Sequence, residues 1–432
     1  MATQHSLPST PPALQPVAAA DRVFAWHAHA ALWFSLGVGL LVMQVGAYLV
    51  PGVSTRDAAM AIVIGSIIGS LLLAFTARLG AETGLSSAAL MHHTYGSWFA
   101  RLPIFLNIAQ LIGWTTFELV IMREGTTAIA QQSLGLDLSS ALGIAATTLV
   151  WGAVLLLLLS GSMTTLVRSI ISRFGLPLVI VSLVWLTWQF GSKLQLQGLD
   201  NFWNRPGNGS MGMLSAVDLV IAMPISWLPL VADYARYGKS ARGALGGTFL
   251  GYVFANMWCY TLGVMVISVS EPGTQMVSAL LLAQGGLIAL SLILVDEIDN
   301  AYGDVYSGSV SAHTVLPKWS VRQWGFLIAA VCCGLAMVLP MHSIEPFLLM
   351  LSSVFVPLYG VILGRLSFGG LPQAATERKV NTSAAGIWIM GIVLFHCIAQ
   401  WAPQWGAALP TLACTFLLAW LRRAARDPAQ RW

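Results

Sequence analysis

Long apolar runs, separated by short polar segments, follow one another along almost the whole chain. A helix needs about 20 apolar residues to cross the hydrocarbon core of a bilayer. By that measure we expect twelve membrane spans, at residues 29–50, 56–77, 99–122, 139–160, 167–190, 214–236, 244–269, 277–304, 323–341, 343–364, 384–402 and 405–421. The longest connection, residues 191–213, contains Asn, Gly and Pro, and we expect it to be an external loop.

The composition supports an all-α polytopic membrane protein. Of the 432 residues, 57% are hydrophobic and 9% are charged, and the mean hydropathy is +0.76. These values exclude an ordinary soluble protein. The five cysteines all lie in apolar stretches, so we expect no disulfide framework. The amino terminus is rich in Pro, Ala, Ser and Thr and lacks the features of a signal peptide, so residues 1–24 are expected to form a disordered tail.

The basic residues predict the orientation, because Lys and Arg accumulate on the cytoplasmic side of a membrane. With the amino terminus inside, seventeen of them fall in cytoplasmic segments and four in outer segments. We therefore expect both termini in the cytoplasm of a multi-pass cell (inner) membrane protein, with residues 422–432 as a basic cytoplasmic tail. An even number of spans follows.

Two spans contain residues that weaken a helix. The first holds Gly37, Gly39 and Gly46, and the sixth holds Pro224 near its middle. Interrupted helices at matching places in two halves of a chain are typical of transporters built from inverted repeats. Gly and Pro are also common in ordinary membrane helices, so composition alone leaves both interpretations open.

The third span, "LPIFLNIAQLIGWTTFELVIMR", has one polar face. Asn107, Gln110, Trp114 and Glu118 fall within an arc of about 80°. Such a face can be a hydrogen-bonded seam between helices. A buried carboxylate such as Glu118 is costly and usually functional, although Glu118 could also reach the outer surface beside Arg123.

The eighth span ends in "LVDEIDNAYGDVYSG", where Asp296, Glu297, Asn300 and Asp304 share an arc of about 100° and Asp299 lies about 60° to one side. One alternative is that the preceding apolar run, residues 277–295, crosses the bilayer alone and leaves the acids at a wet cytoplasmic end.

Against that alternative, no basic residue follows before Lys318, and no span carries a central Lys or Arg. Buried carboxylates without a basic partner must be protonated, hydrated or bound to a cation. We therefore expect a coupling-ion site at this helix, with Asp304 closer to its wet end.

The sixth span, "VDLVIAMPISWLPLVADYARYGKS", places Trp227 just after the interruption. Asp233 and Arg236 are neighbours at i and i+3 near the cytoplasmic end. They are candidates for a gate, or they simply cap the helix.

Three stretches resemble a known family. "SWLPLVADYARYGKS" resembles the "SWLPL-x-x-DY-x-R" signature of nucleobase:cation symporter family 1, closest to its cytosine and hydroxymethylpyrimidine permease branch. "GLSSAALMHHTYGSWFARLPIFLNIAQLIGW" and "VDEIDNAYGDVYSGSVS" resemble that family around spans 3 and 8. The resemblance implies twelve helices of the leucine-transporter type. Residues 25–190 and 214–366 would form a five-plus-five inverted repeat, and residues 367–421 would form two extra helices.

The resemblance also implies a site between spans 1, 3, 6 and 8. Its substrate-binding residues would be Gln44, Trp114, Glu118, Trp227 and Asn300, with Glu118 standing where relatives carry a glutamine. Sodium-coupled members use span 8 hydroxyl groups beside span 1 carbonyl groups. This sequence has Asp299 and Asn300 there instead of Ser or Thr, which leaves sodium and protons both open. Together with the other carboxylates of span 8, the cation-coupling candidates are Gly46, Asp296, Glu297 and Asp299.

The resulting hypothesis is a secondary active symporter that imports a pyrimidine-like nucleobase with sodium or protons. An amino-acid or amine transporter on the same scaffold is the alternative. A membrane enzyme is disfavoured because the eight histidines show no spacing such as H-E-x-x-H, and a channel would need a continuous pore. We expect no cofactor other than a candidate sodium ion, no metal beyond it and no nucleic-acid partner.

Overall fold

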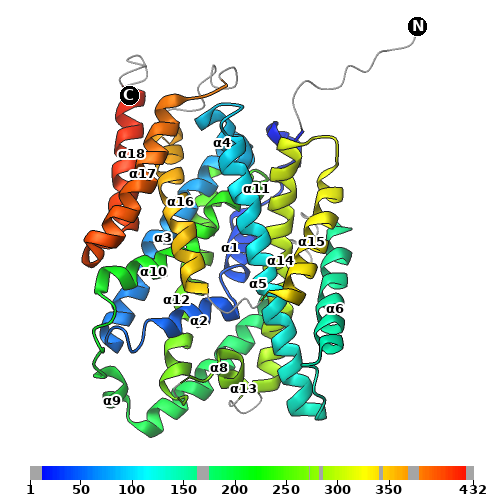
Figure 1. Ribbon diagram of the computed structural model, residues 1–432, viewed down its shortest axis with the longest axis vertical. Helices are drawn as coiled ribbons and strands as arrows, with labels where there is room; N and C mark the ends of the chain where they lie inside the picture. The colour runs from blue at the N-terminus through cyan, green and yellow to red at the C-terminus, as the bar shows by residue number, and fades with distance from the viewer. Residues whose placement is uncertain are drawn as a thin grey trace.

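Long helices lie side by side along the vertical axis of Figure 1, and no sheet connects them in the residues that are described. The computed structural model describes residues 12–162, 175–271, 273–281, 286–339, 344–367 and 379–424. The helices are α1 (Trp26–Ser35), α2 (Leu40–Tyr48), α3 (Thr55–Thr83), α4 (Ser87–Tyr95), α5 (Arg101–Leu134), α6 (Ala141–Leu159), α8 (Leu176–Gln197), α9 (Leu199–Trp203), α10 (Met213–Ser226), α11 (Leu228–Ala235), α12 (Ala241–Ser268), α13 (Met276–Leu281), α14 (Gly286–Val315), α15 (Val321–Val338), α16 (Ile344–Leu366), α17 (Thr382–Trp401) and α18 (Ala408–Ala424).

Most of the expected membrane spans correspond to one helix each. Over the described ranges, nine helices are long and apolar enough to cross a membrane, or ten when the bent pair α1 and α2 counts as one span. The carboxylate-rich α14 and the 17-residue α18 occupy the places of the eighth and twelfth expected spans. The first short helix, η1 (Pro12–Leu14), and the end of α18 lie at the same end of the bundle (Figure 1), as an even number of crossings requires.

Both expected interruptions are present. The first span bends by 63° between α1 and α2. The sixth has a one-residue break at Trp227, between α10 and α11, without a comparable bend, so Met213–Ala235 still counts as one of the nine spans. Pro224 lies inside α10, which ends at Ser226, three residues later than the proline by itself predicts. The two interrupted spans are the first of each expected five-span repeat.

Each interrupted span packs against a helix of the other repeat. Glycines of α12 let the backbone of α1 and α2 approach closely, and glycines of α3 do the same for α10 and α11. The contact glycines are Gly247, Gly251 and Gly263 on α12, and Gly65, Gly69 and Gly80 on α3. Span 1 therefore packs against span 7, and span 6 packs against span 2. An inverted repeat of five spans produces this relation, because each span corresponds to the one five places away.

Two expectations from the sequence need correction. The tail is not disordered from residue 12 onward, because the Arg22 guanidinium donates to the carbonyl of Ala81 (3.0 Å) and the Ser86 hydroxyl donates to that of Ala13 (2.7 Å). Residues 191–213 are not all loop, since α8 extends to Gln197 and α9 follows it.

The eighth span also differs from its expected bounds of 277–304. Residues 276–281 form the separate helix α13, and α14 then runs for 30 residues from Gly286 to Val315. The acidic residues therefore lie in the middle of α14, and the alternative of a wet helix end is wrong. Parts of other predictions, at residues 1–11, 167–174, 282–285 and 425–432, lie outside the described residues.

Candidate functional site

The interruption of span 1 is held by side chains of α14. The Ser35 hydroxyl donates to the Asp296 carboxylate (2.9 Å) at the end of α1, and the backbone N–H of Leu40, the first residue of α2, donates to Glu297 (2.5 Å). Between them, the Asn300 amide donates to the carbonyl of Val38 (3.1 Å). Helix ends leave backbone groups unpaired, and α14 therefore supplies partners for both sides of the gap.

The interruption of span 6 is held in the same way by α5. The Gln110 amide donates to the carbonyl of Ser226 (3.1 Å), and the Asn107 amide donates to that of Pro229 (3.2 Å). Gln110 also donates to the side-chain oxygen of Asn107 (3.0 Å). These two residues form a hydrogen-bonded seam between helices, which is one of the two interpretations given above for the polar face of the third span. In a repeat of five spans, span 3 corresponds to span 8 and span 6 corresponds to span 1. The contact between spans 3 and 6 is therefore the counterpart of the contact between spans 8 and 1.

Aromatic rings surround the two interruptions. Trp114 on α5 is buried against Phe347 of α16 (ring centroids 5.3 Å apart) and Phe117 (6.2 Å). Trp227 lies at the α10–α11 junction with its ring 6.0 Å from that of Trp33 on α1. Trp227 thus lies at the break in span 6, and Trp114 lies one helical turn after Gln110, which binds that break; both tryptophans have aromatic neighbours.

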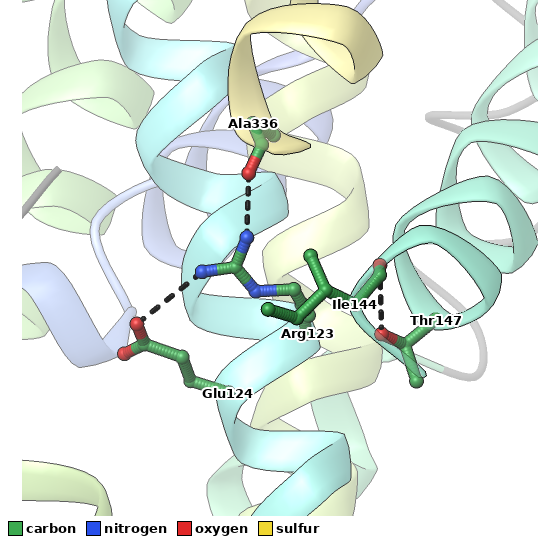
Figure 2. Close-up of polar contacts among 5 residues, drawn as sticks. All are labelled: Arg123, Glu124, Ile144, Thr147 and Ala336. Carbon is green, nitrogen blue, oxygen red and sulfur yellow. Dashed lines mark hydrogen bonds and ion pairs between the residues drawn. The ribbon is translucent and has the colours of Figure 1, made fainter. Parts of the chain in front are cut away.

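Glu118 lies inside the protein and does not reach the outer surface. Its exposed fraction is 3%. Figure 2 shows that Arg123 points elsewhere, because its guanidinium contacts the carbonyl of Ala336 and the carboxylate of Glu124. Glu118 is therefore not neutralised by the arginine that follows it on α5.

The structure separates Gln44 and Gly46 from the α14 cluster. The Gln44 amide donates to the Tyr48 hydroxyl (2.7 Å) and lines a cavity of about 170 Å³ together with Phe117. Gly46 lies against the backbone of Tyr260 on α12, where an added Cβ atom would be 2.4 Å from the Tyr260 carbonyl oxygen. The expected site residues therefore do not all converge on one point.

Asp299 and Asp304 are both buried, with exposed fractions of 7% and 1%. The expectation that Asp304 lies at the wet end of its helix is wrong, because α14 continues for eleven residues beyond it and packs between α5 and α15. Burying a carboxylate without a partner is costly, so a position like that of Asp304 marks a candidate site.

Asp233 and Arg236 form no ion pair in the part of the chain that the structure describes. Asp233 accepts hydrogen bonds from the backbone N–H of Ser87 (3.0 Å) and from the Ser307 hydroxyl. Arg236 donates to the carbonyl of Asp233 (3.2 Å) and to the Tyr306 hydroxyl (3.2 Å). Arg236 thus caps the end of α11, and Asp233 ties α11 to α4 and α14.

Several partners in this arrangement were not singled out from the sequence. Ser35, Ser226, Ser307 and Phe347 contribute to the contacts above, and none carries a charge or a motif that marks it. A periodic signal was available only for Ser307, which follows Asp304 by three residues on α14 and so lies near the same helix face.

Two interrupted helices, each held by the polar face of a span from the other repeat, define a membrane transporter of the leucine-transporter type. A nucleobase-cation-symport-1 family transporter, solved in a closed conformation with bromovinylhydantoin bound, has this fold: TM-score 0.80, 15% identity, and 98% of this chain and 95% of that chain covered. MhsT in complex with L-phenylalanine is also similar, with a TM-score of 0.61, 14% identity and 94% and 99% of the two chains covered.

The sequence identifies the family. Residues 16–421 match the model of the permeases for cytosine/purines, uracil, thiamine and allantoin, and the chain belongs to this family. The cytosine permease of Escherichia coli K12 is 22% identical over 375 residues, which cover 82% of this chain and 84% of that one. The protein is therefore a multi-pass membrane permease and not an enzyme.

Proposed function

We propose that the protein is a secondary active symporter that imports a pyrimidine-like nucleobase, cytosine or hydroxymethylpyrimidine, together with a cation. The observation that carries the proposal is the double interruption, with Trp114, Glu118 and Asn300 on the two helices that hold it. Half-helices that meet near the middle of a membrane offer backbone and side-chain groups to a small polar ligand. Alternating access would then move the two repeats around this ligand.

The chemistry of the surrounding groups suits a flat heteroaromatic ring. The indole N–H of Trp114 and the amide oxygens of Gln110 and Asn300 are buried without a hydrogen-bond partner among the described residues. A pyrimidine carries donors and acceptors on its edge that can pair with such groups, and its faces can stack on aromatic side chains. Each partner missing from a buried site costs about 1–3 kcal/mol, so these groups would set selectivity.

We infer that an amino-acid transporter on the same scaffold is the weaker candidate. An amino acid would need a free helix end for its carboxylate. At the start of α2 that position is taken by Glu297, which accepts the hydrogen bond of the Leu40 N–H (2.5 Å). A second carboxylate at this end would meet the charge of the first.

Binding of a panel of bases and amino acids to the purified protein, with and without sodium, tests the proposed function. We expect a pyrimidine base to bind and amino acids not to compete. Trp114→Ala should weaken binding about 5- to 100-fold through lost stacking. The control Trp98→Ala, at a tryptophan that is 61% exposed, should leave binding unchanged. Competition by amino acids and not by bases would refute the proposal.

We further propose that the protein resides in the inner membrane with both termini in the cytoplasm, on the basis of the distribution of Lys and Arg. In that orientation, Arg236, Tyr306 and His313 face a cytoplasmic cavity of about 610 Å³ beneath the amino-terminal segment. We propose that Asp233 and Arg236 belong to the inner gate through their separate contacts, and that Asp296, Glu297 and Asp299 act near the coupling ion. A reporter fused to the carboxyl terminus and found outside the cell would contradict this orientation.

A further inference from the structure

Helices α5 and α14 pack antiparallel, and three contacts fix their register. The residues in contact are Asn107 with Ser311, Leu111 with Gly308, and Gly125 with Leu294. The two residue numbers in each pair add up to 418 or 419. Between these contacts, a residue of α5 and a residue of α14 lie at the same height along the helix axes, or level, when their two numbers also add up to 418 or 419.

This register brings two acidic residues together. Thr115 is level with Asp304, and Glu118 is level with Ala301. Glu118 therefore lies about 4.5 Å along the helix axis from the level of Asp304 and about 6 Å from that of Glu297, at 1.5 Å per residue. Asp304 occupies the same face of α14 as the residues in contact, so it is directed at α5, whereas the Glu297 carboxylate is directed at the start of α2.

The carboxyl groups differ in what holds them. Glu297 accepts the hydrogen bond of the Leu40 N–H, as described above. By contrast, both oxygens of Asp304 and one oxygen of Glu118 are buried without a hydrogen-bond partner within the described ranges. The guanidinium groups of Arg123 and Arg236 are bound to other residues.

Other titratable groups face the pair from the helices around it. Glu297 and Asp299 of α14 lie within electrostatic reach of Glu118. Tyr234 of α11 and Cys332 of α15 lie within reach of Asp304. None of these groups is a cation, so the surroundings add negative or neutral groups and no compensating positive charge.

Two ionised carboxylates without donors would be very unfavourable in this seam, because each loses its hydration and the two repel each other. A hard metal cation takes about six oxygen ligands. Beside the two carboxyl groups, the neighbouring seam positions Ala301 and Gly308 carry no side-chain oxygen, and Thr115, level with Asp304, adds one hydroxyl group. A single proton shared between two carboxyl groups needs no further ligands.

We propose that Glu118 and Asp304 form a carboxyl pair that binds a proton, and that this proton is the cation coupled to transport. The second half of this inference rests on the proposed function. Loss of the proton places like charges on opposite sides of the α5–α14 seam and loosens it. Asn300, one turn from Asp304, holds the interruption of span 1, so the proton state of the pair biases the substrate site. The size of this effect equals the difference in proton affinity between the two conformations of alternating access.

The proton site is tested without substrate by infrared spectroscopy of the purified protein. Wild type should show the carbonyl band of protonated carboxylic acids near neutral pH. Glu118→Gln and Asp304→Asn should each remove the part of the band that the pair contributes, whereas Asp299→Asn, at another buried carboxyl group without a partner, should leave that part in place. The matched control is Glu124→Gln on the same helix, where the carboxylate is partly exposed beside Arg123. A band that is absent from wild type, or one that neither Glu118→Gln nor Asp304→Asn changes, overturns the pair.

Coupling is tested in sodium-free proteoliposomes with labelled cytosine. We expect an inside-alkaline pH gradient to drive accumulation in wild type and in Glu124→Gln. In Asp304→Asn, accumulation should fall at least tenfold while exchange of internal for external base continues. Accumulation in wild type that follows a sodium gradient and ignores pH would overturn the coupling role. Failure of every variant and of wild type to exchange base would instead refute the proposed function, and the infrared result would still decide the proton site.

Discussion

The contact between Glu297 and the start of α2 gives the sharpest test of how span 1 is held. Glu297 accepts the N–H of Leu40 (2.5 Å) at a buried helix start. We expect Glu297→Ala to lower the free energy of unfolding, because it leaves this donor unpaired in the protein interior. Glu297→Gln should cost less, since its amide oxygen can still accept the bond.

The magnitudes follow from the kind of bond. A hydrogen bond to a charged group contributes about 1.5–3 kcal/mol, and an unsatisfied buried donor costs about 1–3 kcal/mol. Charge-assisted bonds are roughly twice as strong as neutral ones. We therefore expect losses of about 2–3 kcal/mol for Glu297→Ala and about 1 kcal/mol for Glu297→Gln.

Equilibrium unfolding in mixed detergent micelles measures these losses. The control Glu82→Gln removes an exposed i, i+4 pair with Arg78 (3.8 Å), and should cost no more than about 0.5 kcal/mol. Leu40→Pro removes the same N–H at the first residue of α2, where proline is tolerated. In that background the effect of Glu297→Gln should largely disappear.

The competing effect is the cost of burying the Glu297 charge, which a neutral residue would relieve. If Glu297→Gln and Glu297→Ala both stabilise the protein, that cost outweighs the bond, and the reasoning about the helix start is refuted. Full additivity with Leu40→Pro would also contradict it, because the bond would then not be the source of the effect.

Four further changes test other parts of the structure. Gly263→Ala would place a Cβ atom 1.9 Å from the carbonyl oxygen of Met43, so thermal stability in detergent should fall by the equivalent of about 1–3 kcal/mol; unchanged stability would contradict the close packing. Asp218→Asn weakens the carboxylate that accepts two backbone N–H groups at the start of α18, and should cost about 1–2 kcal/mol of unfolding free energy without changing base affinity. Gln110→Leu removes the bond to the α10–α11 junction (3.1 Å), and base affinity measured by equilibrium binding should fall about tenfold, within the 1–3 kcal/mol of a lost buried partner; unaltered affinity would separate this junction from the site. Burial lowers the pKa of His92 from 6.5 to about 4, so the unfolded chain takes up the proton first and stability should fall as the pH drops from about 6.5 toward 4; His92→Gln should flatten that slope, and an unchanged pH profile would count against it.

Much of the candidate site follows from patterns in the sequence. Helical periodicity alone places Asn107, Gln110, Trp114 and Glu118 on one face of a span, and in the structure Asn107 and Gln110 bind the junction of span 6. Gln44 was grouped with Trp114 through the resemblance, but its amide donates to the Tyr48 hydroxyl, and it lines a cavity with Phe117 that Trp114 does not line. The direction of a side chain at a bent helix depends on the bend itself, which hydrophobicity does not encode.

The amino-acid sequence by itself determined the number of apolar segments, their polar faces and the two weak points in spans 1 and 6. Those features depend on local composition and on the 3.6-residue period of a helix. The tertiary structure alone decided which polar face meets which interruption, because the residues that pair are far apart in the chain: Ser35 and Asp296 are separated by 261 positions. It also decided that α14 continues to Val315, and so buried Asp304. Neighbouring helices exclude water from a polar stretch that hydropathy alone assigns to the surface.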